Sequence, residues 1–345
     1  MKGSKVLFVK IGIAFIVISA IIVAIIQYRE YQLRKKSKDF YTKINSDLIY
    51  KNNMVKKHAE MYYAIEDGKS RLFLGKKIFS YDSLGKLIYT REFDSENNEK
   101  NSEIYSYNKN DSLILMETYK GQQNLKDYLD WKVVREYHKY SPSDKRSTRS
   151  IYECPVVKFM TKDFKLGLDS ELIYKEEIQY NSDNKKTEMD GYFGPRYRHI
   201  KRMHATYSYN NESQLVQIAV GGNLSDKVEI SKWDYNKYGM LKSKTSSTSD
   251  KPLTGKEVFT YNIDSNMVTN SIYVIDERDE LKYGGKIQEL YYKNGLKKSR
   301  KEFTAKGVKV KVVVYKYVFY VKDKEKEIQQ SDIDESFVLE DVWGN

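Results

Sequence analysis

The pattern of apolar and polar positions along the chain separates a short N-terminal part from a long β-type part. Residues 11–26 form an uninterrupted apolar run with no polar face, which predicts a helix. From about residue 60 onward, short stretches alternate between apolar and polar residues, as where valines at 308, 310, 312 and 314 enclose Lys309 and Lys311. Such alternation is typical of half-buried strands. The pattern therefore predicts one N-terminal helix followed by a series of β-hairpins.

The apolar run has the properties of a membrane anchor. Residues 6–28 are long enough to cross a bilayer, which takes about 20 residues, and Lys10 can extend to the interface. No small-residue cleavage site follows the run, so the sequence predicts an uncleaved transmembrane signal-anchor. The short N-terminal tail favours a cytoplasmic N-terminus with the bulk of the chain exported. The count of basic residues on the two flanks mildly favours the opposite orientation, but the short tail decides for the exported one.

A tyrosine phrase recurs through the β-type part of the sequence. Its copies are Phe79-Ser80-Tyr81-Asp82, Tyr105-Ser106-Tyr107-Asn108, Tyr207-Ser208-Tyr209-Asn210, Trp233-Asp234-Tyr235-Asn236 and Phe259-Thr260-Tyr261-Asn262. The steps from Tyr81 to Tyr107, from Tyr209 to Tyr235 and from Tyr235 to Tyr261 are each 26 residues. A fixed period is typical of a repeat architecture. Tyrosine fits a half-buried pleated surface, and the Asp or Asn after it can bond local amides and open a turn.

Two versions of the phrase resemble known repeats. Tyr81-Asp82-Ser83-Leu84-Gly85-Lys86-Leu87 resembles the Tyr-Asp-x-x-Gly-x-Leu unit of the YD repeats of the RHS family, and Tyr235-Asn236-Lys237-Tyr238-Gly239-Met240-Leu241 is similar to it. Tyr292-Lys293-Asn294-Gly295-Leu296 resembles the MORN-like repeats of certain bacterial antitoxins. The YD-repeat resemblance covers about residues 60–320 and implies hairpins that coil into an extended or shell-like sheet. The expected fold class is therefore all-β, an antiparallel β-hairpin repeat array forming an extended or curved sheet, with one N-terminal transmembrane helix.

Four parts of the chain are expected from these patterns. They are a transmembrane signal-anchor at 1–28, a basic juxtamembrane stalk at 29–58, a β-hairpin repeat domain at 59–321 and an acidic C-terminal cap or tail at 322–345. The last part is acidic and carries apolar residues such as Phe337 and Trp343, which suits a cap over the final repeat.

Composition narrows the range of functions. Half of the net charge of +12 comes from residues 1–40, so the remainder is a mildly basic surface and a nucleic-acid partner is not expected. The single cysteine, Cys154, excludes a disulfide framework and a multi-cysteine metal site. Of the four histidines, His199 and His204 are five residues apart with no neighbouring Cys or carboxylate at metal-ligand spacing, and the sequence contains no Gly-rich phosphate loop or nucleophile elbow. The sequence thus predicts no cofactor, no metal and no enzymatic activity.

One stretch has the composition of a binding site. Aromatic residues alternate with arginines between residues 192 and 202, and this pattern can stack on sugars or contact anionic groups. The candidate binding residues are Tyr192, Arg196, Tyr197, Arg198 and Arg202. A plainer interpretation, a loop between repeats with a basic edge, stays open.

The sequence favours a membrane-anchored, non-enzymatic β-repeat protein that binds or scaffolds an envelope protein or glycan. One alternative is an antitoxin or immunity-like partner of a toxin system, based on the MORN-like hairpin. A third is an envelope hydrolase that works through paired carboxylates.

Overall fold

The computed structural model describes residues 2–46, 48–66, 70–110, 112–120, 132–155, 171–193, 203–222 and 225–320, with the side chains of the first helix described from Val23 onward. Two helices come first, α1 (Lys2–Ile44) and α2 (Ile49–Asn52). The strands are β1 (Val55–Glu66), β2 (Ser70–Tyr81), β3 (Leu87–Asp94), β4 (Glu99–Tyr107), β5 (Leu113–Lys120), β6 (Lys132–Ser141), β7 (Arg146–Pro155), β8 (Glu171–Tyr180), β9 (Lys186–Phe193), β10 (Met203–Tyr209), β11 (Leu215–Gly222), β12 (Ser225–Tyr235), β13 (Leu241–Thr248), β14 (Lys251–Asn262), β15 (Met267–Ile275), β16 (Leu281–Tyr291), β17 (Lys297–Thr304) and β18 (Lys309–Phe319).

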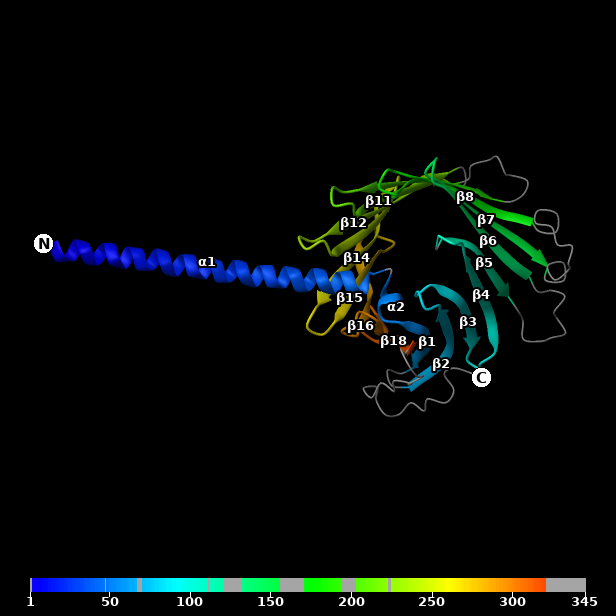
Figure 1. The fold of residues 1–345 in the computed structure, drawn as a ribbon, viewed down its shortest axis with the longest axis horizontal. Coiled ribbons are helices and arrows are strands. Elements are labelled where there is room, and N and C mark those ends of the chain that lie inside the picture. Colours follow the sequence, from blue (N-terminus) through cyan, green and yellow to red (C-terminus); the bar gives the residue numbers. More distant parts are fainter. Residues whose placement is uncertain are drawn as a thin grey trace.

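The strands form one closed sheet. Each strand pairs antiparallel with the next strand along the chain, as β1 does with β2 and β9 with β10. The last strand, β18, returns to pair with β1 from Val55↔Phe319 to Ala64↔Lys311. Figure 1 shows the resulting ring of strands, with α1 projecting away from it. The described residues thus build an 18-stranded antiparallel barrel.

The closed ring confirms the prediction of an all-β sheet of antiparallel hairpins. It corrects the prediction that this sheet forms an extended, open array. An open array of the YD-repeat type, as the RHS-like resemblance implies, would leave the first and last strands unpaired on one side. Here β1 is bonded on both sides, and the Tyr320 hydroxyl donates to the Tyr81 carbonyl at 2.6 Å across the seam. Closure satisfies the backbone groups that an edge strand leaves exposed. The prediction of an open or coiled RHS-like array is therefore wrong.

The expected membrane anchor also needs correction. Helix α1 does not end near Tyr28 but continues unbroken to Ile44, through a segment that carries Arg29, Glu30 and Arg34. In the part of the chain that the structure describes, no helix combines the length and the apolar character needed to cross a membrane. This finding overturns the transmembrane helix at 1–28 and the single-pass location with an exported bulk. The side chains of residues 1–22, which include most of the apolar run, lie outside the described residues.

The tyrosine of the phrase connects one hairpin to the hairpin before it. The Tyr235 hydroxyl donates to the carbonyl of Leu215 at 2.8 Å, and Tyr261 donates to Leu241 at 2.9 Å. In each case the acceptor is the first residue of a strand in the preceding repeat. The same bond recurs from Tyr107 to Leu87, from Tyr209 to Lys186 and from Tyr317 to Lys297. The repeat period therefore reflects a tyrosine bond between successive hairpins.

The Asp or Asn after the tyrosine organises the turn, as its position predicts. The Asp82 carboxylate accepts hydrogen bonds from the amides of Leu84 and Lys86, both at 2.9 Å. The Asn236 side chain does the same for Tyr238 and Met240 at 2.9 and 3.1 Å. These local bonds fix the turn without tertiary contacts.

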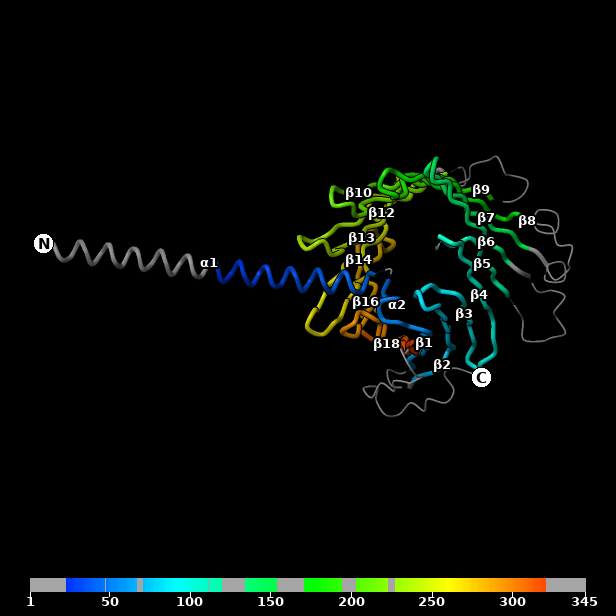
Figure 2. Tube along the Cα trace, viewed as in Figure 1, coloured from blue at the N-terminus to red at the C-terminus, as the bar shows by residue number. Residues whose placement is uncertain are grey.

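The two faces of the sheet differ in what they contact. Helix α2 and the end of α1 lie on one face, which we call the inner face; Figures 1 and 2 show α2 within the ring. Tyr50 of α2 stacks on His58 of β1, with ring centroids 5.2 Å apart, and on Tyr81 at 4.5 Å. Phe40 of α1 packs on Val268 and Tyr291. Because side chains alternate along each strand, the pairing register then assigns every strand position to the inner or the outer face.

At two of the three phrase turns that contain a glycine, a helical segment lies directly on the turn. Gly85 has a φ of +76°, and a Cβ atom there would lie 2.5 Å from the Lys51 backbone of the segment that forms α2. Gly295 has a φ of +91°, and its Cβ would lie 3.1 Å from Lys43 of α1. The equivalent positions of other phrase turns have the same positive φ with a side chain: Asn184 (57°) and Ser213 (68°). Close approach of the helix, in addition to backbone conformation, therefore explains the glycine at residues 85 and 295.

Candidate functional site: a charged inner wall

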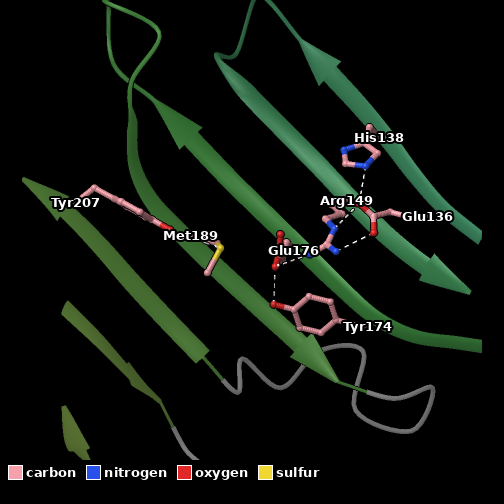
Figure 3. Close-up of polar contacts among 7 residues, drawn as sticks. All are labelled: Glu136, His138, Arg149, Tyr174, Glu176, Met189 and Tyr207. Atoms are coloured by element: carbon pink, nitrogen blue, oxygen red, sulfur yellow. Dashed lines mark hydrogen bonds and ion pairs between the residues drawn. The ribbon is translucent and has the colours of Figure 1, made fainter. Parts of the chain in front are cut away.

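A polar cluster lies on the inner face of β6, β7 and β8. In the pairing register His138 stands opposite Arg149, and Arg149 stands opposite Glu176. Glu136 and Tyr174 lie two residues from His138 and Glu176, so they share the same face. Figure 3 shows these side chains pointing toward one another from neighbouring strands. We call the five residues the inner-wall cluster.

Arg149 joins the two carboxylates of the inner-wall cluster. Its guanidinium contacts Glu136 twice, with Nε 2.6 Å from Oε1 and Nη2 donating to Oε2 at 2.7 Å. Its remaining Nη1 donates to Glu176 Oε1 at 3.1 Å. A two-point arginine–carboxylate contact is among the strongest hydrogen-bonded ion pairs in proteins. One arginine therefore fixes the positions of two carboxylates on separate strands.

Two further groups complete the cluster. Nε2 of His138 lies 2.6 Å from Glu136 Oε1, and the Tyr174 hydroxyl donates to Glu176 Oε1 at 2.8 Å. The Glu136 and Glu176 side chains are 8% and 12% exposed, whereas those of Arg149 and His138 are 33% and 31% exposed. Glu136 is thus buried within the wall and Glu176 is nearly so, while the Arg149 and His138 side chains are partly exposed.

The electrostatics of the cluster keep Glu136 ionised. Burial alone would raise the pKa of Glu136, but hydrogen bonds from His138 and Arg149 and the charge of Arg149 outweigh it and hold the pKa at about 2. In turn, hydrogen bonding to Glu136 raises the pKa of Arg149. Burial and the bond to Glu176 raise the pKa of the Tyr174 hydroxyl. At neutral pH the wall therefore presents an ionised Glu136, a charged Arg149 guanidinium and a protonated Tyr174 phenol.

A tyrosine–glutamate pair recurs around the inner face. In each pair a tyrosine hydroxyl donates to a glutamate two residues away on the same strand. The pairs are Tyr62–Glu60 (2.6 Å), Tyr105–Glu103 (2.7 Å), Tyr174–Glu176 (2.8 Å) and Tyr291–Glu289 (2.7 Å). Burial would raise the pKa of Glu60, Glu103 and Glu289, but hydroxyl, imidazole and ammonium neighbours lower it. The Tyr174–Glu176 pair of the inner-wall cluster is thus one of four such pairs among the described residues of the inner face.

The pKa directions bear on the hydrolase hypothesis. A carboxyl group that donates a proton near neutral pH needs a pKa raised above its ordinary value. Among the described carboxyl groups whose pKa departs clearly from that value, the direction is downward, as it is for Glu60, Glu136 and Glu289. Glu60, Glu136 and Glu289 are therefore suited to accept hydrogen bonds and poorly suited to act as general acids.

The low pKa of Glu136 predicts an acid-sensitive contribution to stability. A carboxyl group whose pKa falls from 4.5 to about 2 on folding stabilises the protein above pH 4.5, and this contribution is lost as the pH falls toward 2. The shift corresponds to about 3 kcal/mol. We expect urea unfolding at pH 7 and pH 2.5 to show a pH dependence smaller by about this amount in Glu136→Gln than in the unmodified protein. An equal pH dependence in the two proteins would contradict the assignment.

Most of the binding residues predicted from the sequence fall outside the described part. Arg196, Tyr197, Arg198 and Arg202 lie there, so their grouping stays a prediction. Tyr192 is on β9, and Lys175 Nζ lies 5.9 Å from its ring centroid. Lys175 and Tyr192 stand opposite each other on the outer face, away from the inner-wall cluster.

Sequence reasoning did not identify the inner-wall cluster. Glu136, Arg149 and Glu176 are 13 and 27 residues apart along the chain and match no spacing motif. Only the pairing register places them together. The one sequence feature that could have indicated the cluster is the alternation of side chains along each strand. It places a charged residue on the same face of three neighbouring strands. Within the described residues, no group of three His, Cys, Asp or Glu side chains is arranged to hold a metal ion.

Comparisons with known proteins return solved structures of low similarity. No protein-family model and no curated protein sequence matches the chain. A porin-like protein from Bacteroides uniformis is 10% identical over 77% of this chain and 97% of its own, with a TM-score of 0.33. A mutant of Rh. blastica porin is 9% identical over 75% and 96%, with a TM-score of 0.29. The Photorhabdus luminescens Tc holotoxin pore is 12% identical over 67% of this chain and 13% of its own, with a TM-score of 0.25.

Proposed function

We propose that this chain is a non-enzymatic binding protein that holds a polar glycan against the inner wall of its closed sheet. The observation that carries the proposal is the Arg149 contact to both Glu136 and Glu176, which fixes charged and hydroxyl groups on an accessible concave surface. Glycans are recognised through hydrogen bonds to their hydroxyl groups, for which carboxylates, guanidinium groups and tyrosine hydroxyls are suitable partners.

The size of the ring supports this proposal. Closed sheets of 16–18 strands enclose more space than their own side chains fill. Helix α2 and the end of α1 pack against β1, β2 and β14–β16, whereas the inner-wall cluster lies on β6–β8. Fixed polar groups also lose little conformational freedom when a ligand binds, which favours affinity.

The experiment that tests the proposal is binding of the full chain to a panel of neutral, anionic and amino-sugar glycans, with matched variants on the two faces. Glu176→Gln and Tyr174→Phe change inner-wall groups with little change in shape. We expect each to weaken binding to the preferred glycan about tenfold, as the loss of a hydrogen bond to a charged group implies.

The matched control is Glu117→Gln. Glu117 forms an ion pair with Arg135 at 2.5 Å, also between neighbouring strands and similarly buried, but on the outer face. We expect this variant to bind the glycan like the unmodified protein. Absence of glycan binding, or an equal loss in Glu117→Gln and Glu176→Gln, would exclude the inner wall as the site. Capture of a protein in place of a glycan would favour the scaffolding role that the sequence also allows.

A further inference from the structure

Two exposed aromatic side chains stand beside the inner-wall cluster. On the described strands, the exposed aromatic residues are Tyr140 of β6 (47%), Phe193 of β9 (41%) and Tyr283 of β16 (37%). Tyr140 lies two residues from His138 on the same strand, and Phe193 pairs with Tyr174, so both point to the inner face. Tyr283 lies on the outer face. Two of the three exposed rings on the described strands are therefore next to the proposed glycan site.

The two inward rings lie on opposite sides of the cluster. The pairing register places Phe193 level with Glu136, three strand spacings away on β6. Tyr140 lies four residues along β6 from Glu136. With neighbouring strands about 4.8 Å apart and about 3.4 Å per residue, the two rings start from Cα atoms about 20 Å apart along the sheet. The direct line between them passes Arg149 and Glu176, which pair with each other on β7 and β8.

Each exposed ring rests on a second ring that is itself bonded into the wall. The Tyr140 ring meets Tyr180 edge-on with centroids 5.9 Å apart, and the Tyr180 hydroxyl lies 3.0 Å from Ser147 Oγ. The Phe193 ring lies 4.7 Å from that of Tyr174, whose hydroxyl bonds within the inner-wall cluster. A ring that is positioned before binding loses little conformational freedom when a ligand covers it.

A sugar unit can contact both kinds of group. Its hydroxyls form hydrogen bonds with carboxylates and guanidinium groups, while its C–H groups pack against the negatively polarised face of an aromatic ring. Gluco-configured units, whose hydroxyls are equatorial, leave broad C–H faces for such packing. A sugar unit has about the size of one aromatic ring, so a single unit cannot reach both Tyr140 and Phe193.

We propose that Tyr140 and Phe193 each pack against a sugar unit of one linear oligosaccharide, and that the units between them bond to Arg149 and Glu176. This inference rests on the proposed glycan binding and names its substrate class, an extended chain of several gluco-configured units that runs diagonally from β9 to β6. The two rings set the minimum length of the chain, while the inner-wall cluster bonds its polar groups. The predicted acidic C-terminal cap, residues 322–345, lies outside the described residues, and the site includes none of it.

The test is calorimetric binding of the full chain to β-1,4-linked oligomers of glucose and of N-acetylglucosamine, from monosaccharide to hexasaccharide. We expect the affinity to rise with chain length and to level off once a chain reaches both rings. Tyr140→Leu and Phe193→Leu should each weaken hexasaccharide binding about tenfold, a loss typical of one aromatic contact. The double variant should lose the rise with length. Tyr140→Phe and Phe193→Tyr keep the rings and should bind like the unmodified protein.

The matched control is Tyr283→Leu, which removes an exposed ring in edge contact with Tyr273 from the outer face. We expect it to leave hexasaccharide binding unchanged. Equal affinity for monosaccharide and hexasaccharide would overturn the two-ring site. So would unchanged hexasaccharide binding in the double leucine variant while Glu176→Gln still weakens it, and the proposed function would then stand without the two rings. Absence of binding to every glycan tested would overturn both.

Discussion

Replacing Arg149 with methionine is expected to destabilise the protein by about 3–5 kcal/mol, because it leaves two buried carboxylates without their shared cation. Glu136 and Glu176 are 8% and 12% exposed, so water cannot replace the guanidinium fully. Methionine keeps much of the aliphatic volume of arginine, so the loss of stability reports mainly on the lost charge and its hydrogen bonds. Urea unfolding at pH 7 measures the difference.

The matched control for this substitution is Arg91→Met. Arg91 pairs with Glu99 at 2.6 Å, but both side chains are about a third exposed, at 37% and 33%. Exposed pairs of this kind contribute no more than about 1 kcal/mol. The double variant Arg149→Met, Glu136→Gln should recover part of the loss, because it removes one of the stranded charges. Equal losses for Arg149→Met and Arg91→Met would show that the inner-wall cluster is not energetically special.

Gly85→Ala is expected to destabilise the protein by about 2–5 kcal/mol and to displace α2 from the inner face. A left-handed conformation costs an alanine about 1–2 kcal/mol. In addition, the new Cβ would lie 2.5 Å from the Lys51 backbone, and the rearrangement this forces typically costs about 1–3 kcal/mol. Urea unfolding gives the stability, and limited proteolysis within residues 45–54 reports on the displacement.

Gly239→Ala separates the two contributions. Gly239 has the same φ of +76°, but the nearest atom that its Cβ would meet is the flexible Gln214 Nε2 at 3.4 Å. We expect only the conformational cost of about 1–2 kcal/mol at this site, with α2 as protected from protease as in the unmodified protein. If both alanine variants lose the same stability, helix docking does not explain the glycine at position 85.

The inner-wall cluster and the contacts of the helical segment lie on different strands of the ring. Phe40 and Tyr50 cover the inner face at β14–β16 and at β1–β2, so the sequence before the first strand supplies much of the apolar core. The inner-wall cluster lies on the strands β6–β8, which these helical contacts do not reach. The stability of the α2 contacts and the proposed glycan binding at Arg149 are therefore expected to respond separately to substitution. The antitoxin or immunity-like role remains a prediction from the sequence.

The sequence alone determined the local structure of the repeats. Tyrosine followed by Asp or Asn encodes a turn through side-chain bonds to the next few amides, as Asp82 and Asn236 show, and alternation encodes antiparallel hairpins. These interactions lie within a few residues of one another, so the pattern of residues is sufficient to predict them. The acidic character of the last 18 residues was visible in the same way.

Only the tertiary structure decided that the array closes and which groups meet inside it. Closure depends on strand tilt and register summed over all the strands, and a 26-residue period does not specify that sum. The contact of Arg149 with Glu136 and Glu176 depends on the register of three strands, and a shift of one residue would move each side chain to the opposite face. Likewise, only the tertiary structure shows what the end of α1 contacts. Phe40 and Tyr41 pack there against strands that lie more than 200 residues away along the chain.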